Sequence, residues 1–263
     1  MKTIGLIVAY DGTPFAGWQR QPDRPTIQGC LEEAVSKINQ TPTEVRGASR
    51  TDAGVHAEYQ IAAFDTERPY DTGRWRIALN ATTPPEITVR CAFEAPAGFE
   101  PRFESRGKHY RYWLWQNAYL PPFLYHRAAH TRPLDIENMQ KAAQYLIGEH
   151  DFSSFRAYDC QAKTPVRTIT RLDISTPGGP YVFGCHDESA LIQIDVEGTA
   201  FLKQMVRIIV GTLIEFGLGR NATEMLDVLN GRKRVLAGRT APADGLTLVR
   251  SYSSIDELVR ISQ

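Results

Sequence analysis

The chain has 263 residues, enough for one or two domains with a buried core. Its hydrophobic content of 42% and aromatic content of 10% exclude a disordered chain, and no apolar run approaches the ~20 residues of a membrane-spanning helix. The 30 Lys and Arg residues balance 30 Asp and Glu residues, which excludes a protein coated in positive charge. The opening segment MKTIGLIVAY lacks the long apolar stretch of a signal peptide, so we expect a cytoplasmic protein with no membrane partner.

The balance of charge does not say where the charges lie. Of the basic residues, 23 are Arg and only 7 are Lys. Arg makes planar, bidentate contacts with phosphate and stacks on bases, which Lys does less well. The excess of Arg therefore fits a nucleic-acid partner, and genomic codon bias explains it equally well.

The hydrophobic pattern of the first half predicts a β-α-β-β-α-β order of elements. Ile4, Leu6 and Val8 alternate with other residues, as is typical of a strand, and Thr26 is placed to cap a helix. The expected elements are a strand at 3–10, a helix from Thr26, short strands near 43–48 and 59–66, a helix at 73–81 and a strand at 86–94.

The second half repeats this order with longer loops. The expected elements are a strand at 106–116, a helix at 135–148, strands near 167–175 and 189–197, an apolar helix at 201–217, a helix at 222–230 and a strand near 246–252. We therefore predict an α+β protein of two tandem ferredoxin-like, RNA-recognition-like units, with mainly antiparallel sheets and the helices on one side. The units would cover residues 1–99 and 100–263, with a catalytic cleft at their seam.

A polar loop, RGASRTDAGVHA at 46–57, is the first candidate site. Asp52 is its only carboxylate, and Arg50 and Arg46 lie nearby in the sequence. A lone Asp in a loop is usually a turn former or a cap, but that role explains less well why two Arg and a His surround it. An Asp held by Arg stays ionised and oriented, as a carboxylate nucleophile or base requires.

Two further segments carry candidate residues. In RGKHYRYWLWQ (106–116), Tyr110 lies on one face of the expected strand and Arg111 on the other, which fits either an aromatic sheet core or a base-stacking platform. Arg207 interrupts the apolar helix at 201–217. A surface position is the default for this Arg; if it is buried it needs a carboxylate partner, for which Asp52 is the candidate.

Several motifs, in the same order, resemble those of the bacterial tRNA pseudouridine synthases of the TruA type. They are YDGTPFAGWQRQ (10–21), TIQGCLEEAV (26–35), GASRTDAGVHA (47–57), KHYRY (108–112), GEHDFSSF (148–155), FLKQMVRIIVGTL (201–213) and APADGLTLVRSY (241–252). The resemblance spans nearly the whole chain. It implies an isomerase (an intramolecular transferase) that converts uridine to pseudouridine at positions 38–40 of the tRNA anticodon stem-loop. It also implies a homodimer that uses no metal or other cofactor.

The resemblance also implies roles for individual residues. Asp52 matches the catalytic aspartate, Tyr110 the tyrosine that stacks on the target base and can serve in proton removal, and Arg207 the arginine that pairs with the aspartate. Arg50 matches an arginine that helps to hold the flipped-out nucleotide, and Leu246 an apolar residue of the base pocket. The Arg-rich loops, which include Arg46 and Arg111, are expected to grip the phosphates.

Other functions compete with this one. A non-catalytic RNA-binding protein of two RNA-recognition-like units would bind tRNA without making pseudouridine, but it gives no reason for an acid within a basic loop. A hydrolase with paired carboxylates is disfavoured because the closest acid downstream of Asp52 is Glu58. His126 and His130 have the spacing of zinc ligands, but no Cys pair lies near them, so no metal site is expected.

Overall fold

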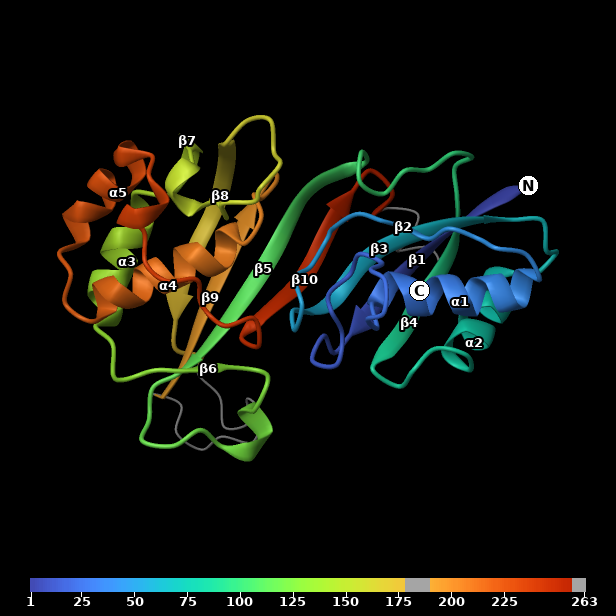
Figure 1. The fold of residues 1–263 in the computed structure, drawn as a ribbon, viewed down its shortest axis with the longest axis horizontal. Helices are drawn as coiled ribbons and strands as arrows, with labels where there is room; N and C mark the ends of the chain where they lie inside the picture. The colour runs from blue at the N-terminus through green and yellow to red at the C-terminus, as the bar shows by residue number, and fades with distance from the viewer. Residues whose placement is uncertain (178–189, 257–263) are drawn as a thin grey trace. The chain divides into compact units, whose positions relative to one another are not determined.

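The computed structural model describes residues 1–177 and 190–256 (Figure 1). The chain forms two compact units. The first comprises Met1–Lys108 together with the C-terminal segment that begins at Thr247, and the second comprises His109–Leu246. The boundary predicted at 99/100 lies nine residues before the end of the first stretch at Lys108. The sequence-based division did not include the C-terminal segment in the first unit.

The first unit is built on a sheet with the strand order β4-β1-β3. Strands β1 (Lys2–Tyr10) and β3 (His56–Thr66) are antiparallel, as are β1 and β4 (Ile87–Ala95). The short strand β2 (Arg46–Gly47) pairs antiparallel with one end of β3. Both faces of β1 are buried, since Leu6 and Ile7 point to opposite faces and neither is exposed to solvent.

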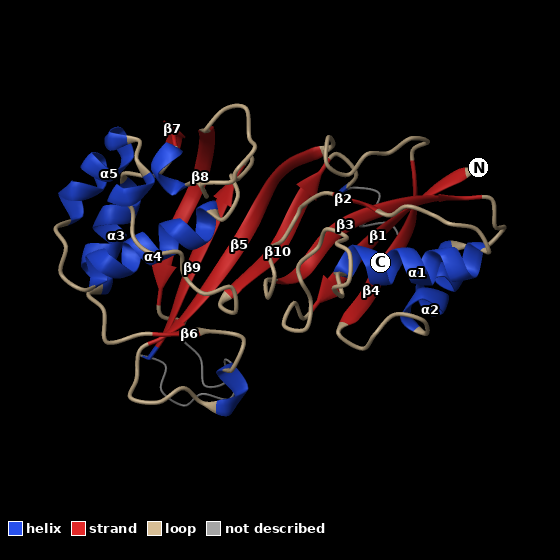
Figure 2. Ribbon diagram, in the orientation of Figure 1, coloured by secondary structure: helices blue, strands red, loops and turns tan. Residues whose placement is uncertain are grey.

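Two helices lie beside this sheet (Figures 1 and 2). Helix α1 (Ile27–Asn39) begins after Thr26, whose side chain accepts a hydrogen bond from the Gly29 N–H, and it buries an apolar stripe that includes Leu31 and Val35. Helix α2 (Thr72–Asn80) begins after Asp71, which caps the Arg74 N–H in the same way. Its buried Trp75 meets Phe64 of β3 edge to face, with ring centroids 4.8 Å apart.

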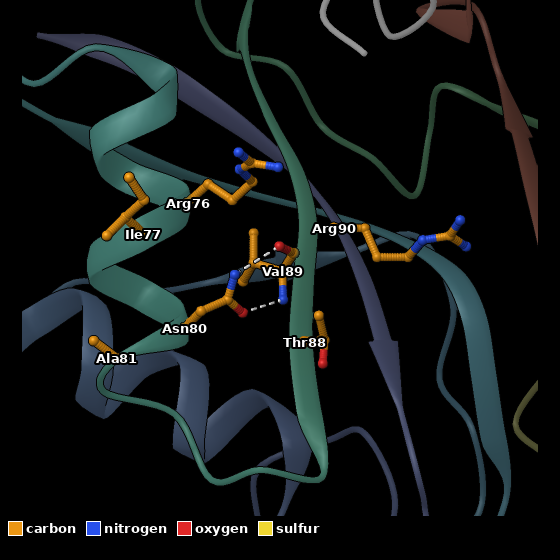
Figure 3. Close-up of a pocket in the computed structure, with 7 residues that line it drawn as sticks. All are labelled: Arg76, Ile77, Asn80, Ala81, Thr88, Val89 and Arg90. Carbon is orange, nitrogen blue, oxygen red and sulfur yellow. Dashed lines mark hydrogen bonds between the residues drawn. The ribbon is translucent and has the colours of Figure 1, made fainter.

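The free edge of β4 is partly covered by a side chain of α2. The Asn80 amide donates to the Val89 carbonyl at 2.9 Å, and the Val89 N–H donates to Asn80 Oδ1 at 2.8 Å, so that one side chain imitates a neighbouring strand (Figure 3). An open groove runs here between α2 and β4, with Arg76 and Arg90 among its lining residues. None of the residues predicted for the functional site lines it.

Strand β10 (Leu246–Ser253) runs parallel to β3, with Thr247 opposite His56 and Leu248 opposite Ala57. The sequence predicts this strand but not its pairing with the first unit. The pairing places the C-terminal strand beside the start of β3, four residues after Asp52 in the sequence.

The second unit has the strand order β5-β9-β8-β7. These strands are β5 (Ser105–Trp115), β9 (Leu191–Gly198), β8 (Val166–Ser175) and β7 (Gly148–Asp151), and β6 (Ala129–His130) pairs parallel with the end of β5. The helices are α3 (Ile136–Gln144), α4 (Met205–Gly217) and α5 (Met225–Gly231), with short 3-10 turns at Pro122–Leu124, Ser153–Phe155, Ala222–Glu224 and Arg234–Leu236. Helix α3 packs against α4 and β8. The first residue of the strand predicted at 189–197 lies outside the described residues.

The predicted mixed α+β class is confirmed. Within residues 1–177 and 190–256, no helix is both long enough and apolar enough to cross a membrane.

Candidate functional site

The loop that carries Asp52 connects β2 to β3, and hydrogen bonds anchor its start to β3. The Ala48 N–H donates to the Ile61 carbonyl at 2.9 Å, and the buried Gln60 side chain donates to the Ser49 carbonyl at 2.6 Å. A turn closes the loop, because the Val55 N–H donates to the Asp52 carbonyl at 3.2 Å. Asp52 is half-buried on this turn. Hydrogen bonds to β3 therefore hold the loop that carries Asp52.

A second segment, residues 10–18, lies against the same loop. The Trp18 N–H donates to the Thr51 carbonyl at 3.0 Å, and the Tyr10 and Thr51 hydroxyls share a buried hydrogen bond of 2.8 Å. The residue before Asp52 is thus held through both its backbone and its side chain. The sequence places YDGTPFAGW and RTDAGVHA far apart, and only the fold reveals that the first segment supports the second.

Glycine is required where the two segments meet. Gly17 has a φ of +98°, and a Cβ there would lie 2.6 Å from the Thr51 carbonyl oxygen. A Cβ at Gly12 would lie 2.1 Å from the Val55 carbonyl oxygen. Any larger residue at either position must displace the backbone that carries Asp52.

His56 closes this arrangement at the start of β3. Its side chain is buried, and its Nδ1 accepts the Gly12 N–H at 3.1 Å. Asp11 Oδ1 lies 3.2 Å from the same nitrogen and also accepts hydrogen bonds from the Thr13 N–H and hydroxyl. His56 therefore connects the start of β3 to the segment that contains Gly12.

The two arginines of the loop differ in their surroundings. Arg50, two residues before Asp52, is exposed. Arg46 forms ion pairs with Asp65 at 2.8 Å and Glu100 at 2.9 Å. Its hydrogen bond lowers the pKa of the Asp65 carboxyl group against the opposing effect of burial. Arg46 therefore ties β2 to β3, and 20% of its side chain stays accessible.

Tyr110 lies in the second unit, on β5, and is 8% exposed. Its ring meets Phe201 edge to face, with the centroids 5.2 Å apart and the planes at 88°. Arg111, the next residue, donates from Nε to Asp195 at 2.9 Å and lies over the Trp113 ring. Leu246, 5% exposed, lies at the start of β10, where its N–H donates to the Ala243 carbonyl.

Arg207 lies in the first turn of α4. It is half-buried, which is intermediate between the surface position and the buried position considered from the sequence. Its Nε donates to the Ala241 carbonyl at 2.8 Å, and the Ala241 N–H donates back to the Arg207 carbonyl at 3.0 Å. Burial raises the pKa of the neighbouring Tyr112, and the positive charge of Arg207 opposes that rise. These hydrogen bonds connect Arg207 of α4 to the segment that leads into β10.

The predicted residues are divided between the units. Arg46, Arg50 and Asp52 belong to the first unit, and Tyr110, Arg111, Arg207 and Leu246 belong to the second. The ion pair between Asp52 and Arg207 joins residues of different units and stays a prediction. Sequence reasoning missed the supporting residues Tyr10, Thr51, His56 and Phe201. The paired glycines in DGTPFAG were the one signal that pointed to a close approach of backbone in the loop.

Known proteins resemble this chain over most of its length. A family model described as tRNA pseudouridine synthase matches residues 6–104 and 142–252, which include Asp52, Arg207 and Leu246. A protein of Acetivibrio thermocellus named tRNA pseudouridine synthase A is 41% identical over 96% of this chain and 100% of its own length. Proteins of the same name from Geobacter sulfurreducens and Halalkalibacterium halodurans are 42% and 44% identical, over 94% and 95% of this chain and 98% and 92% of their own lengths. The chain belongs to the tRNA pseudouridine synthase family.

Proposed function

We propose that the protein isomerises uridine to pseudouridine in tRNA, at positions 38–40 of the anticodon stem-loop. The observation that carries this proposal is the near full-length similarity to tRNA pseudouridine synthases, together with the hydrogen bonds that hold the Asp52 loop to β3 and to the segment at 10–18. In the reaction the bond between uracil N1 and ribose C1′ breaks and a bond between C5 and C1′ forms. The C5 hydrogen is released to solvent and N1 gains a proton, so no cofactor is needed to balance the reaction.

Asp52 is the proposed catalytic carboxylate. A carboxyl group acts as a nucleophile or a base in its ionised form. In that form it can attack the sugar, attack the base or abstract a sugar proton, and each role requires the carboxylate to be held still. Arg207 would orient it through a charge-assisted hydrogen bond.

The remaining residues are proposed to bind the flipped-out nucleotide. Unstacking the target uridine costs a few kcal/mol, and stacking on the Tyr110 ring offsets about 1–3 kcal/mol of it. Leu246 would line the base pocket, and Arg50 would hold the nucleotide. We also propose that Arg46 and Arg111 contact the phosphates. They would do so through the parts of their side chains that remain accessible to solvent.

The proposal also covers the fold of each half and the assembly of the protein. We propose two ferredoxin-like halves, 1–99 and 100–263, and a cytoplasmic homodimer that binds one tRNA across its subunits. In the first half, the order β4-β1-β3 with β2 at the edge supports the ferredoxin-like assignment, since every pair is antiparallel. The order β5-β9-β8 supports it in the second.

The test is release of tritium from tRNA labelled at uracil C5, with single labelled uridines at positions 38, 39 and 40. Wild type is expected to release tritium and Asp52→Asn to release almost none, because Asn has no negative charge. Tyr110→Phe is expected to bind tRNA nearly as well as wild type and to lose turnover. Asp227→Asn, which changes an exposed Asp of α5 in the same way, serves as the control. Equal release from wild type and Asp52→Asn would overturn the catalytic role of Asp52. Binding of tRNA without any release by wild type would favour the non-catalytic RNA-binding alternative.

A further inference from the structure

We propose that Asp195 is a positioning residue for Tyr110, acting from the opposite face of the sheet through the two residues that flank Tyr110 on β5. The inference rests on the role proposed above for Tyr110. It concerns residues of the second unit only, on the neighbouring strands β5 and β9.

The Asp195 carboxylate binds both neighbours of Tyr110. His109 Nε2 lies 2.6 Å from Oδ1, Arg111 Nε donates to the same oxygen at 2.9 Å, and Arg111 Nη2 lies 3.4 Å from Oδ2. The side chain of Gln193 donates to Oδ2. Only 5% of the Asp195 side chain is exposed, against 11% for His109. One buried carboxylate thus fixes the residues before and after Tyr110; we call this group the Asp195 clamp.

The clamp and the Tyr110 ring lie on opposite faces of β5, because successive side chains of a strand alternate. On the ring side, Tyr110 meets Phe201, which follows the end of β9 by three residues. Strand β9 therefore supplies the partner on one face, and the segment that follows it supplies the partner on the other. Gly198, its last residue, leaves little room, since a Cβ there would lie 3.1 Å from the Phe201 ring and 2.6 Å from the Thr168 carbonyl oxygen.

The charge of Asp195 is maintained by its donors. Burial by itself raises the pKa of Asp195, but the hydrogen bonds from His109, Arg111 and Gln193 together lower it to about 2. The carboxylate is therefore ionised wherever the protein is folded at ordinary pH. A buried ion pair adds little net stability compared with apolar packing, and its best-attested use is to fix one geometry. A clamp of this kind is suited to holding a strand in place.

Partly exposed charged side chains lie next to the Asp195 clamp. Arg171 of β8 lies 3.9 Å from Asp195 Oδ2, 3.1 Å from Glu197 and 3.0 Å from Asp173. Asp173 lies directly opposite Asp195 in the register of β8 and β9, but its side chain is 61% exposed. The chain thus offers two aspartates in one network, one buried against the flanks of Tyr110 and one at the surface.

The experiment compares Asp195→Asn with Asp173→Asn as the matched control. Pseudouridine formation gives kcat and KM for tRNA, at a temperature where circular dichroism reports every variant as folded. The ¹⁹F NMR signal of 3-fluorotyrosine at position 110, assigned with Tyr110→Phe, reports the ring environment without depending on activity. We expect Asp195→Asn to lower kcat by about 10- to 100-fold, to change KM by less than about threefold and to shift the fluorine signal. Asp173→Asn should match wild type in all three.

Each outcome bears on one claim. If wild type forms no pseudouridine, the proposed function fails, and the fluorine signal alone decides whether Asp195 positions Tyr110. If wild type is active and Asp195→Asn matches Asp173→Asn in either kcat or the fluorine signal, the positioning role is overturned and the clamp only stabilises the sheet. If Asp195→Asn does not fold, Arg111→Lys, which keeps the charge but loses the bidentate geometry, is judged by the same two measurements.

Discussion

At the scale of single residues, the position of Asp52 depends on a glycine 35 residues earlier. Gly17→Ala is expected to destabilise the protein by about 1–2 kcal/mol through its left-handed backbone alone. The added Cβ, 2.6 Å from the Thr51 carbonyl oxygen, must also push the Asp52 loop away, so the total loss should be larger. Urea unfolding measures the stability, and tritium release by the folded variant measures the displacement of the loop.

Gly98→Ala separates the two effects. Gly98 also has a positive φ, of +73°, but a Cβ there would have no atom within 4 Å. This variant should show only the backbone strain and keep wild-type turnover. If both variants lose the same stability and the same activity, the contact between Gly17 and Thr51 does not position the loop.

At the scale of elements, local patterns predicted most of the helices and strands. The caps Thr26 and Asp135 and the apolar stripes of α1, α3 and α4 are local signals, and so is the alternation in β1 and β4. The four-residue β7 and the two-residue β6 carry no such signal. The parallel pairing of β10 with β3 joins residues about 190 positions apart, and nothing in either segment alone specifies it.

The same limit applies to the candidate site. Motif spacing could indicate Asp52, Tyr110 and Arg207 one by one. The supports of the Asp52 loop are hydrogen bonds between residues 41 and 44 positions apart, from Tyr10 to Thr51 and from Gly12 to His56. In the sequence, Asp195 cannot be distinguished from other acids of an alternating strand. Its burial and its pairing depend on donors from β5 and β8, which are distant in the sequence.

The element-scale prediction concerns the edge strand β4. Asn80→Ala removes both hydrogen bonds that the side chain makes with Val89 and leaves these backbone groups at a free sheet edge (Figure 3). We expect a loss of about 1–3 kcal/mol in urea unfolding, at about 1 kcal/mol per bond, together with faster amide exchange at Val89. Asn230→Ala, an exposed change near the end of α5, measures the accompanying gain in helix propensity. Similar stabilities for the two variants would mean that the edge bonds contribute nothing.

At the scale of the whole molecule, the formal net charge is zero, but the individual cations differ in their pairing and exposure. Several are already paired with acids: Arg46 with Asp65 and Glu100, and Lys141 with Glu137 at 2.7 Å on the exposed face of α3. Arg50 is exposed beside Asp52. A polyanion such as tRNA responds to the local charge of the surface it touches, so the total charge does not determine its affinity.

Binding of tRNA should therefore weaken steeply with salt despite the neutral total charge, because each phosphate contact releases condensed counterions. We expect the logarithm of the association constant to fall linearly with the logarithm of the salt concentration, and Arg50→Gln to reduce that slope by about 0.7–0.9, the value of one phosphate contact. Lys141→Gln should leave the slope unchanged, because that cation is paired with Glu137 on the exposed face of α3. Fluorescence anisotropy of labelled tRNA across a salt series measures both slopes. A flat salt dependence in wild type would show that base stacking dominates the affinity, and an unchanged slope in Arg50→Gln would remove Arg50 from the phosphate contacts.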